Sequence, residues 1–187
     1  PANSVSLSNN IGMGAALVGD GGNVTATLKN CSVGFNQDQG ILVRQGATFT
    51  TTVTLDGNDV FNNNSGAGRA AGGIFFATPS TVAGFTANKI HGNNGDEIAV
   101  DAQPNGGDTW NLSGAAACST PNQIYCYGAP SVGLRILDSA PPNTKVNAAG
   151  TSWTNLVPVK GTDFQFDMTK FDVMSLPACS AVTATCN

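Results

Sequence analysis

The densest group of side chains that could do chemistry is an acidic cluster formed by Asp96, Glu97 and Asp101. Carboxylate oxygens are ligands that Ca²⁺ prefers in proteins, so a calcium ion is the one cofactor that these residues predict. No arginine or lysine aligns with the cluster to complete a catalytic set, and His91 is the only histidine. We therefore predict no catalytic residue and no other metal site, and we interpret His91 as a surface turn residue.

Four aromatic residues could stack on a sugar ring, and they define a second kind of candidate site. They are Tyr125, Tyr127, Trp110 and Trp153. The two tyrosines flank Cys126 in a predicted surface loop, whereas Trp153 falls on a position that we expect to point into the core. Binding of surface glycans or cleavage of a polysaccharide is therefore an alternative function.

The five cysteines fall into two close pairs and one single residue, Cys31. The pairs Cys118 with Cys126 and Cys179 with Cys186 have spacings of eight and seven residues, which suit small disulfide loops better than metal sites with closer cysteines. Disulfides persist in oxidising compartments, so these two predicted bonds indicate a secreted or cell-surface protein. The alternative is that all five are buried thiols of a cytosolic protein.

The composition excludes several classes of protein. Charged residues make up 11% of the 187 residues, against about 25% in an ordinary globular protein. The net charge of −4 with only 8 basic residues lacks the positive surface of a nucleic-acid-binding protein. The hydrophobic fraction of 41% argues against disorder. Since no apolar run is long enough to span a bilayer, we expect no membrane insertion.

An internal repeat organises most of the chain. Residues 28–36, 55–63 and 85–93 share one pattern: an apolar residue, two residues, Asn or Cys, one residue, Val or Ile, two residues, then Asn. A second apolar run follows each copy, at residues 41–43, 74–76 and 98–100. Weaker copies extend the pattern in both directions to about six units. The recurring Asn or Cys position then holds Asn10, Cys31, Asn58, Asn88, Asn122 and Thr151.

The repeat predicts short strands joined by turns, because its apolar runs are short and β-branched and no helical period extends over a long window. Stacked turns place like residues above like, so the recurring asparagines are expected to form a hydrogen-bonded column at a corner. These residues resemble the right-handed parallel β-helix repeat of pectate-lyase-like proteins. We therefore predict an all-β, right-handed parallel β-helix of about six rungs over residues 1–156. A β-sandwich is the alternative, but it does not explain the recurring asparagine.

The resemblance implies little about activity, because that architecture occurs in lyases, hydrolases, adhesins and scaffolds. Its enzymes would carry calcium-binding carboxylates with an Arg or Lys base, or paired aspartates with His and Lys. This sequence lacks the hydrolase signatures, since His91-Gly92 has no preceding glycine and Arg135-Ile136-Leu137 has no lysine.

The pattern stops at the end of the chain, where residues 157–187 are expected to form a C-terminal cap. Five apolar side chains of this segment could contact another subunit: Phe164, Phe166, Met168, Phe171 and Met174. No comparable cap precedes the first rung, so the sequence predicts a structural or adhesive protein that binds itself head to tail and forms filaments. The alternative is that the chain is the terminal piece of a longer solenoid.

Overall fold

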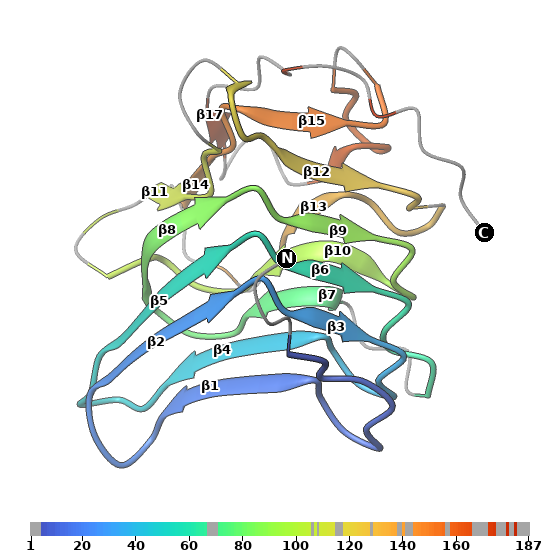
Figure 1. Cartoon of the computed structure of the whole chain (residues 1–187). Coiled ribbons are helices and arrows are strands. Elements are labelled where there is room, and N and C mark those ends of the chain that lie inside the picture. The colour runs from blue at the N-terminus through green and yellow to red at the C-terminus, as the bar shows by residue number, and fades with distance from the viewer. Residues whose placement is uncertain are drawn as a thin grey trace.

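The computed structural model shows a parallel β-solenoid, in which the chain winds through stacked turns of short strands (Figure 1). It describes residues 5–66, 71–105, 107, 109–114, 118–127, 129–137, 140, 144–155, 158–165, 172–174, 179 and 182. All pairs between named strands are parallel. The predicted fold class is confirmed, with about five turns where the repeat predicted six.

Each turn supplies three strands, one to each side of the solenoid. The first three turns contain β1 (Ala15–Gly19), β2 (Val24–Lys29), β3 (Ser32–Gly34), β4 (Ile41–Gln45), β5 (Thr51–Asp56), β6 (Asp59–Phe61), β7 (Ala71–Phe76), β8 (Thr81–Thr86) and β9 (Lys89–His91). The remaining strands are β10 (Asp96–Val100), β11 (Thr109–Asn111), β12 (Asn122–Tyr125), β13 (Leu134–Ile136), β14 (Lys145–Asn147), β15 (Thr151–Trp153), β16 (Phe164–Gln165) and β17 (Asp172–Met174).

Every third strand pairs with its counterpart in the next turn. One side is the six-stranded sheet β1-β4-β7-β10-β13-β16, and a second is the five-stranded sheet β3-β6-β9-β12-β15. The third side consists of two three-stranded sheets, β2-β5-β8 and β11-β14-β17. Because β16 pairs with β13 and β17 pairs with β14, parallel stacking continues beyond residue 156, where a cap was predicted to begin.

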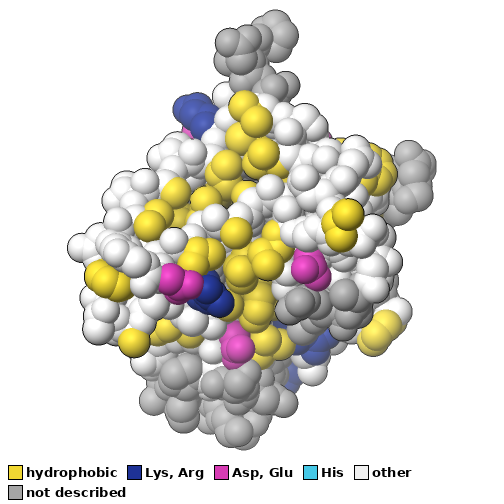
Figure 2. All heavy atoms as spheres, turned by 90° about the horizontal axis from the view of Figure 1, so that it is seen from below, with side chains coloured by type: hydrophobic (Ala, Val, Ile, Leu, Met, Phe, Trp, Pro, Cys, Tyr) yellow, Lys and Arg dark blue, Asp and Glu magenta, His cyan; other side chains and the backbone are white. Residues whose placement is uncertain are grey.

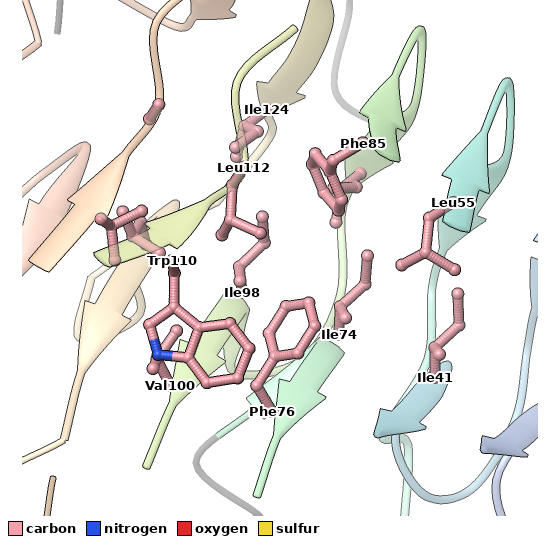
Figure 3. Close-up of a cluster of buried hydrophobic side chains, with 14 of the residues drawn as sticks. Ile41, Leu55, Ile74, Phe76, Phe85, Ile98, Val100, Trp110, Leu112 and Ile124 are labelled. Atoms are coloured by element: carbon pink, nitrogen blue, oxygen red, sulfur yellow. The ribbon is translucent and has the colours of Figure 1, made fainter. Parts of the chain in front are cut away.

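The core lies inside the coil, where alternate residues of each strand point inward. The register places Ile41, Ile74 and Ile98 in one row, and Val60, Ile90 and Ile124 in another. These side chains are at most 3% exposed. Burial of one such side chain contributes about 1.5–3 kcal/mol. Figure 3 shows part of this core, including Trp110, whose ring lies 4.8 Å from that of Phe76.

Candidate functional site

The first asparagine column runs along one corner of the solenoid. Asn58 donates from its backbone N–H and from Nδ2 to Oδ1 of Asn88, at 3.1 and 3.0 Å. Asn88 makes the same two bonds to Asn122, at 3.0 and 3.1 Å. At the two ends of the column, Cys31 donates its N–H to Asn58, and Thr151 lies in register with Asn122. Five of the six predicted corner residues therefore share one column.

The sixth predicted corner residue, Asn10, belongs to a second column that the sequence analysis did not identify. Asn10 donates to Oδ1 of Asn36, Asn36 to Asn63, and Asn63 to Asn93, with Nδ2 to Oδ1 distances of 2.7–2.8 Å. Val5, not Asn10, takes the first-column place in this turn, because Ser32 donates its N–H to the Val5 carbonyl. The assignment of Asn10 was thus wrong by five residues. The repeat itself held the signal, since it ends with this second asparagine.

Glu97 ends the second column. Its two carboxyl oxygens accept the backbone N–H and the Nδ2 of Asn93, and the residue is fully buried. Glu97 directly precedes Ile98, which is in register with Ile74 and Leu134, and the residues that precede those two are Gly73 and Gly133. Burial raises the pKa of Glu97 well above its ordinary value, and the hydrogen bonds from Asn93 act in the opposite direction. A glutamate side chain therefore occupies the place of the next asparagine.

The acidic residues do not gather into a calcium site, which corrects the prediction from Asp96, Glu97 and Asp101. The Asp96 carboxylate accepts hydrogen bonds from the Arg135 guanidinium and, at 2.9 Å, from the N–H of Val132. Glu97 points inward, and Asp101 lies beyond the far end of β10. Five strand residues span about 16 Å. Among the residues that the structure describes, no group of three possible metal-binding side chains occurs.

Four rings form an aromatic column on the outer face of the five-stranded sheet. His91 lies between Phe61 and Tyr125, with ring centroids 5.6 and 4.5 Å apart and interplanar angles of 11° and 10°. Phe35 meets the edge of the column at 5.3 Å. Nε2 of His91 lies 2.9 Å from Asp59, so this residue ends a strand and is packed rather than standing in a turn.

The four aromatic residues that the sequence offered for sugar binding have other contacts. Trp110 and Trp153 are fully buried. Tyr127 donates its hydroxyl to the buried Asp163, and Tyr125 has one ring face on His91. Stacking on a sugar needs an open ring face. The two buried tryptophans have none, and one face of Tyr125 lies against His91.

The cysteine pairing differs from the prediction. Cys118 is bonded to Cys179, with a Cα–Cα distance of 5.4 Å, so neither Cys118–Cys126 nor Cys179–Cys186 is formed. The reason is topological: stacking brings together residues from different turns, and 61 residues separate this pair. Cys126 is also disulfide-bonded, and Cys31 is a buried free thiol, whereas Cys186 lies outside the described residues.

The C-terminal side chains predicted to bind another subunit are only partly described. Phe164 lies in β16, where it is 8% exposed and belongs to the core, so it is not an exposed contact residue. Phe166, Met168 and Phe171 lie outside the described residues, as does the side chain of Met174.

The N-terminal end of the solenoid has open strand edges. Ala15 donates its N–H to Gly40, and the Gly19 carbonyl accepts from Gly46, so alternate residues of β1 face β4. Ala16 and Val18 therefore direct their N–H and C=O groups away from β4. In β2, Val24 donates its N–H to Thr50 and so faces β5. The N–H and C=O groups of Thr25 and Thr27 therefore point outward. No described strand pairs with these outer edges.

The third side of this end is covered. Leu7 donates its N–H to Ser32, and Asn9 donates to Gly34, so residues 5–10 lie along β3. Among the described strands of this end, β1 and β2 are therefore the ones without a covering segment.

An apolar layer lies between these edges. Leu7, Ala15, Leu17 and Leu28 pack against the core but are only partly buried. Figure 2 looks onto this end and shows hydrophobic side chains across its centre. Ile11 and Val5 are also exposed, by 85% and 55%. This end combines unpaired backbone groups with uncovered apolar surface.

The fold defines the protein as a parallel β-solenoid in which no described strand pairs with the outer edges of β1 and β2. Comparisons with family models, curated proteins and solved structures found no match. In the part of the chain that the structure describes, no helix has the length and apolar character needed to cross a membrane.

Proposed function

We propose that the protein is a structural solenoid that associates with a second copy of itself through its N-terminal end. The observation that supports this most directly is the open edge of β1 and β2, where backbone pairing stops. An open strand edge is a template for another chain, because its N–H and C=O groups point outward in a row. The second copy supplies the strands that a neighbouring turn supplies inside the solenoid.

Two terms favour this association. Each backbone hydrogen bond that forms contributes about 0.5–1.5 kcal/mol net. Covering the apolar layer around Leu17 and Leu28 adds about 25 cal/mol for each Å² removed from water. Both terms act in the same place, because the open edges border the apolar layer.

The charges around this end suit a second copy. Lys29 pairs with Asp56 at 2.8 Å, and Arg44 pairs with Asp20. Hydrogen bonds from Lys29 and Thr86 lower the pKa of Asp56, so its carboxylate remains charged at neutral pH. Since each cation here has its own anion, two copies meet without a strong like-charge repulsion.

We infer a location outside the cell, in a structural or adhesive assembly. The disulfide between Cys118 and Cys179 supports this location, because disulfides persist in oxidising compartments.

Sedimentation velocity over a range of protein concentrations tests the proposal. The side chain of Ala16 is exposed and its N–H points to the open edge, so Ala16→Pro removes an outward donor without breaking a bond to β4. We expect the unchanged chain to associate as its concentration rises. We expect Ala16→Pro to remain monomeric at concentrations at least tenfold higher. The control Ala16→Thr keeps the N–H and should associate like the unchanged chain. A monomeric unchanged chain, or equal association of the proline variant, would overturn the proposal.

A further inference from the structure

The two ends of the solenoid carry an extra segment on the same side. At the N-terminal end, residues 5–10 lie along β3. At the other end, Cys179 donates its N–H to Thr151 and Val182 donates to Trp153, so these two residues lie beside β15. Both β3 and β15 belong to the five-stranded sheet. That side therefore has one strand position more than the other two.

This arrangement opposes head-to-tail stacking. If one copy continued the spiral of another, residues 5–10 of one copy would occupy the same place as Cys179 and Val182 of the other. Separating the copies by one strand spacing, about 4.8 Å, removes the overlap. This separation leaves a gap one strand wide between β1 and β2 of one copy and the described strands of the other. Head-to-tail contact thus pairs the strand edges on one side of the solenoid and leaves the edges on the other two sides unpaired.

We infer that the N-terminal ends of two copies instead meet around a twofold axis through the middle of β1. The chain winds through residues 5–10, then β1, then β2, so each of these three edges lies further along the spiral than the one before it. In a copy turned over about this axis the order is reversed. Residues 5–10 then lie beside the partner's β2, and β1 lies antiparallel to the partner's β1. All three edges reach pairing distance together.

The side chains at this end fit the same arrangement. Leu17 in β1 meets the same layer of the partner, and Leu7 approaches the side that carries the partner's Leu28. A twofold contact of this kind uses one surface on both subunits and closes on itself. The product is a dimer with one continuous apolar core, not a filament. This inference rests on the proposed self-association and specifies its geometry.

Cross-linking of single-cysteine variants tests the geometry. Ala16→Cys places an exposed thiol on β1, near the axis, and a short bis-maleimide should join two copies into a covalent dimer. Ala83→Cys is the matched control, because Ala83 is also exposed but lies in the third turn on another side. Cys31 is buried, so the unchanged chain gives the background.

The outcomes separate the two proposals. A dimer by sedimentation, with at least tenfold more cross-linked product from Ala16→Cys than from Ala83→Cys, supports the twofold contact. Assemblies that grow with concentration and give no Ala16→Cys cross-link overturn the twofold contact but leave the proposed self-association standing. Monomers at all concentrations overturn both.

Discussion

Glu97 stands where neighbouring turns have glycine, and its carboxyl group accepts the two hydrogen bonds that an asparagine accepts elsewhere. The next turn has Tyr127 at the second-column position, two residues after Tyr125, which is in register with His91. Without Glu97, the N–H and Nδ2 of Asn93 would be buried donors without this acceptor. The column is completed by a side chain that reaches in from β10.

This placement makes stability depend on pH. Burial raises the pKa of Glu97 above its ordinary value of 4.5, so the folded state holds the proton more tightly than the unfolded state. The contribution of Glu97 to stability is therefore greatest at acid pH. It is lost as the pH rises from 4.5 through the pKa of Glu97 in the folded state.

We predict that Glu97→Gln raises the free energy of unfolding at neutral pH, and that its advantage disappears in acid. The amide keeps an acceptor for Asn93 but cannot ionise in the core. Urea unfolding of both chains across this pH range measures the difference. A glutamine variant that is less stable than the unchanged chain at neutral pH would show that the carboxylate is the favoured form.

At the scale of elements, the asparagine columns hold each turn to the next. Asn88 accepts two hydrogen bonds from Asn58 and donates Nδ2 to the Leu55 carbonyl at 2.9 Å. A buried polar group that loses its partner costs about 1–3 kcal/mol. Asn88 also donates Nδ2 to Asn122, so at this corner one side chain serves four backbone or amide groups.

Asn88→Ala is expected to lower the free energy of unfolding by about 2–4 kcal/mol, because it leaves Asn58 without its acceptor. Asn111→Ala is the control: this exposed asparagine lies outside both columns and should change stability by less than about 0.5 kcal/mol. Denaturant unfolding of the two variants gives both values. Equal effects would contradict a stabilising role for the column.

The sequence predicts local features of the elements well and their contacts in space less well. The repeat at residues 55–63 and 85–93 correctly indicates strands, inward positions and a corner column, because stacking turns a periodic sequence into rows of like residues. The Cys118–Cys179 bond and the contacts of Cys179 and Val182 with β15 were not predictable in this way. They depend on which turns become neighbours, and the irregular turn lengths and weaker copies near the C-terminus obscure that.

The candidate site was predictable only in outline. The outward donors of the first turn depend on which residues of β1 and β2 face their pairing partners β4 and β5, and the repeat does not give that alternation. The misplacement of Asn10 concealed the cover that residues 5–10 provide over β3. That segment lies over β3, whereas no described segment covers β1 or β2.

At the scale of the whole molecule, the protein is a stack of parallel turns that has an apolar layer at its N-terminal end. The outer edges of β1 and β2 border an apolar layer, and no described strand covers them. A second copy turned over on this end would pair both edges and bury the layer.

Hydrogen exchange at the outward amides of β1 and β2 tests this claim most directly. In a single copy the N–H groups of Ala16, Val18, Thr25 and Thr27 face water, whereas that of Ala15 is bonded to Gly40. We predict that the outward amides exchange quickly in dilute protein and become protected as concentration rises, while Ala15 is protected throughout. Fast exchange of Ala16 and Val18 at every concentration would contradict the account.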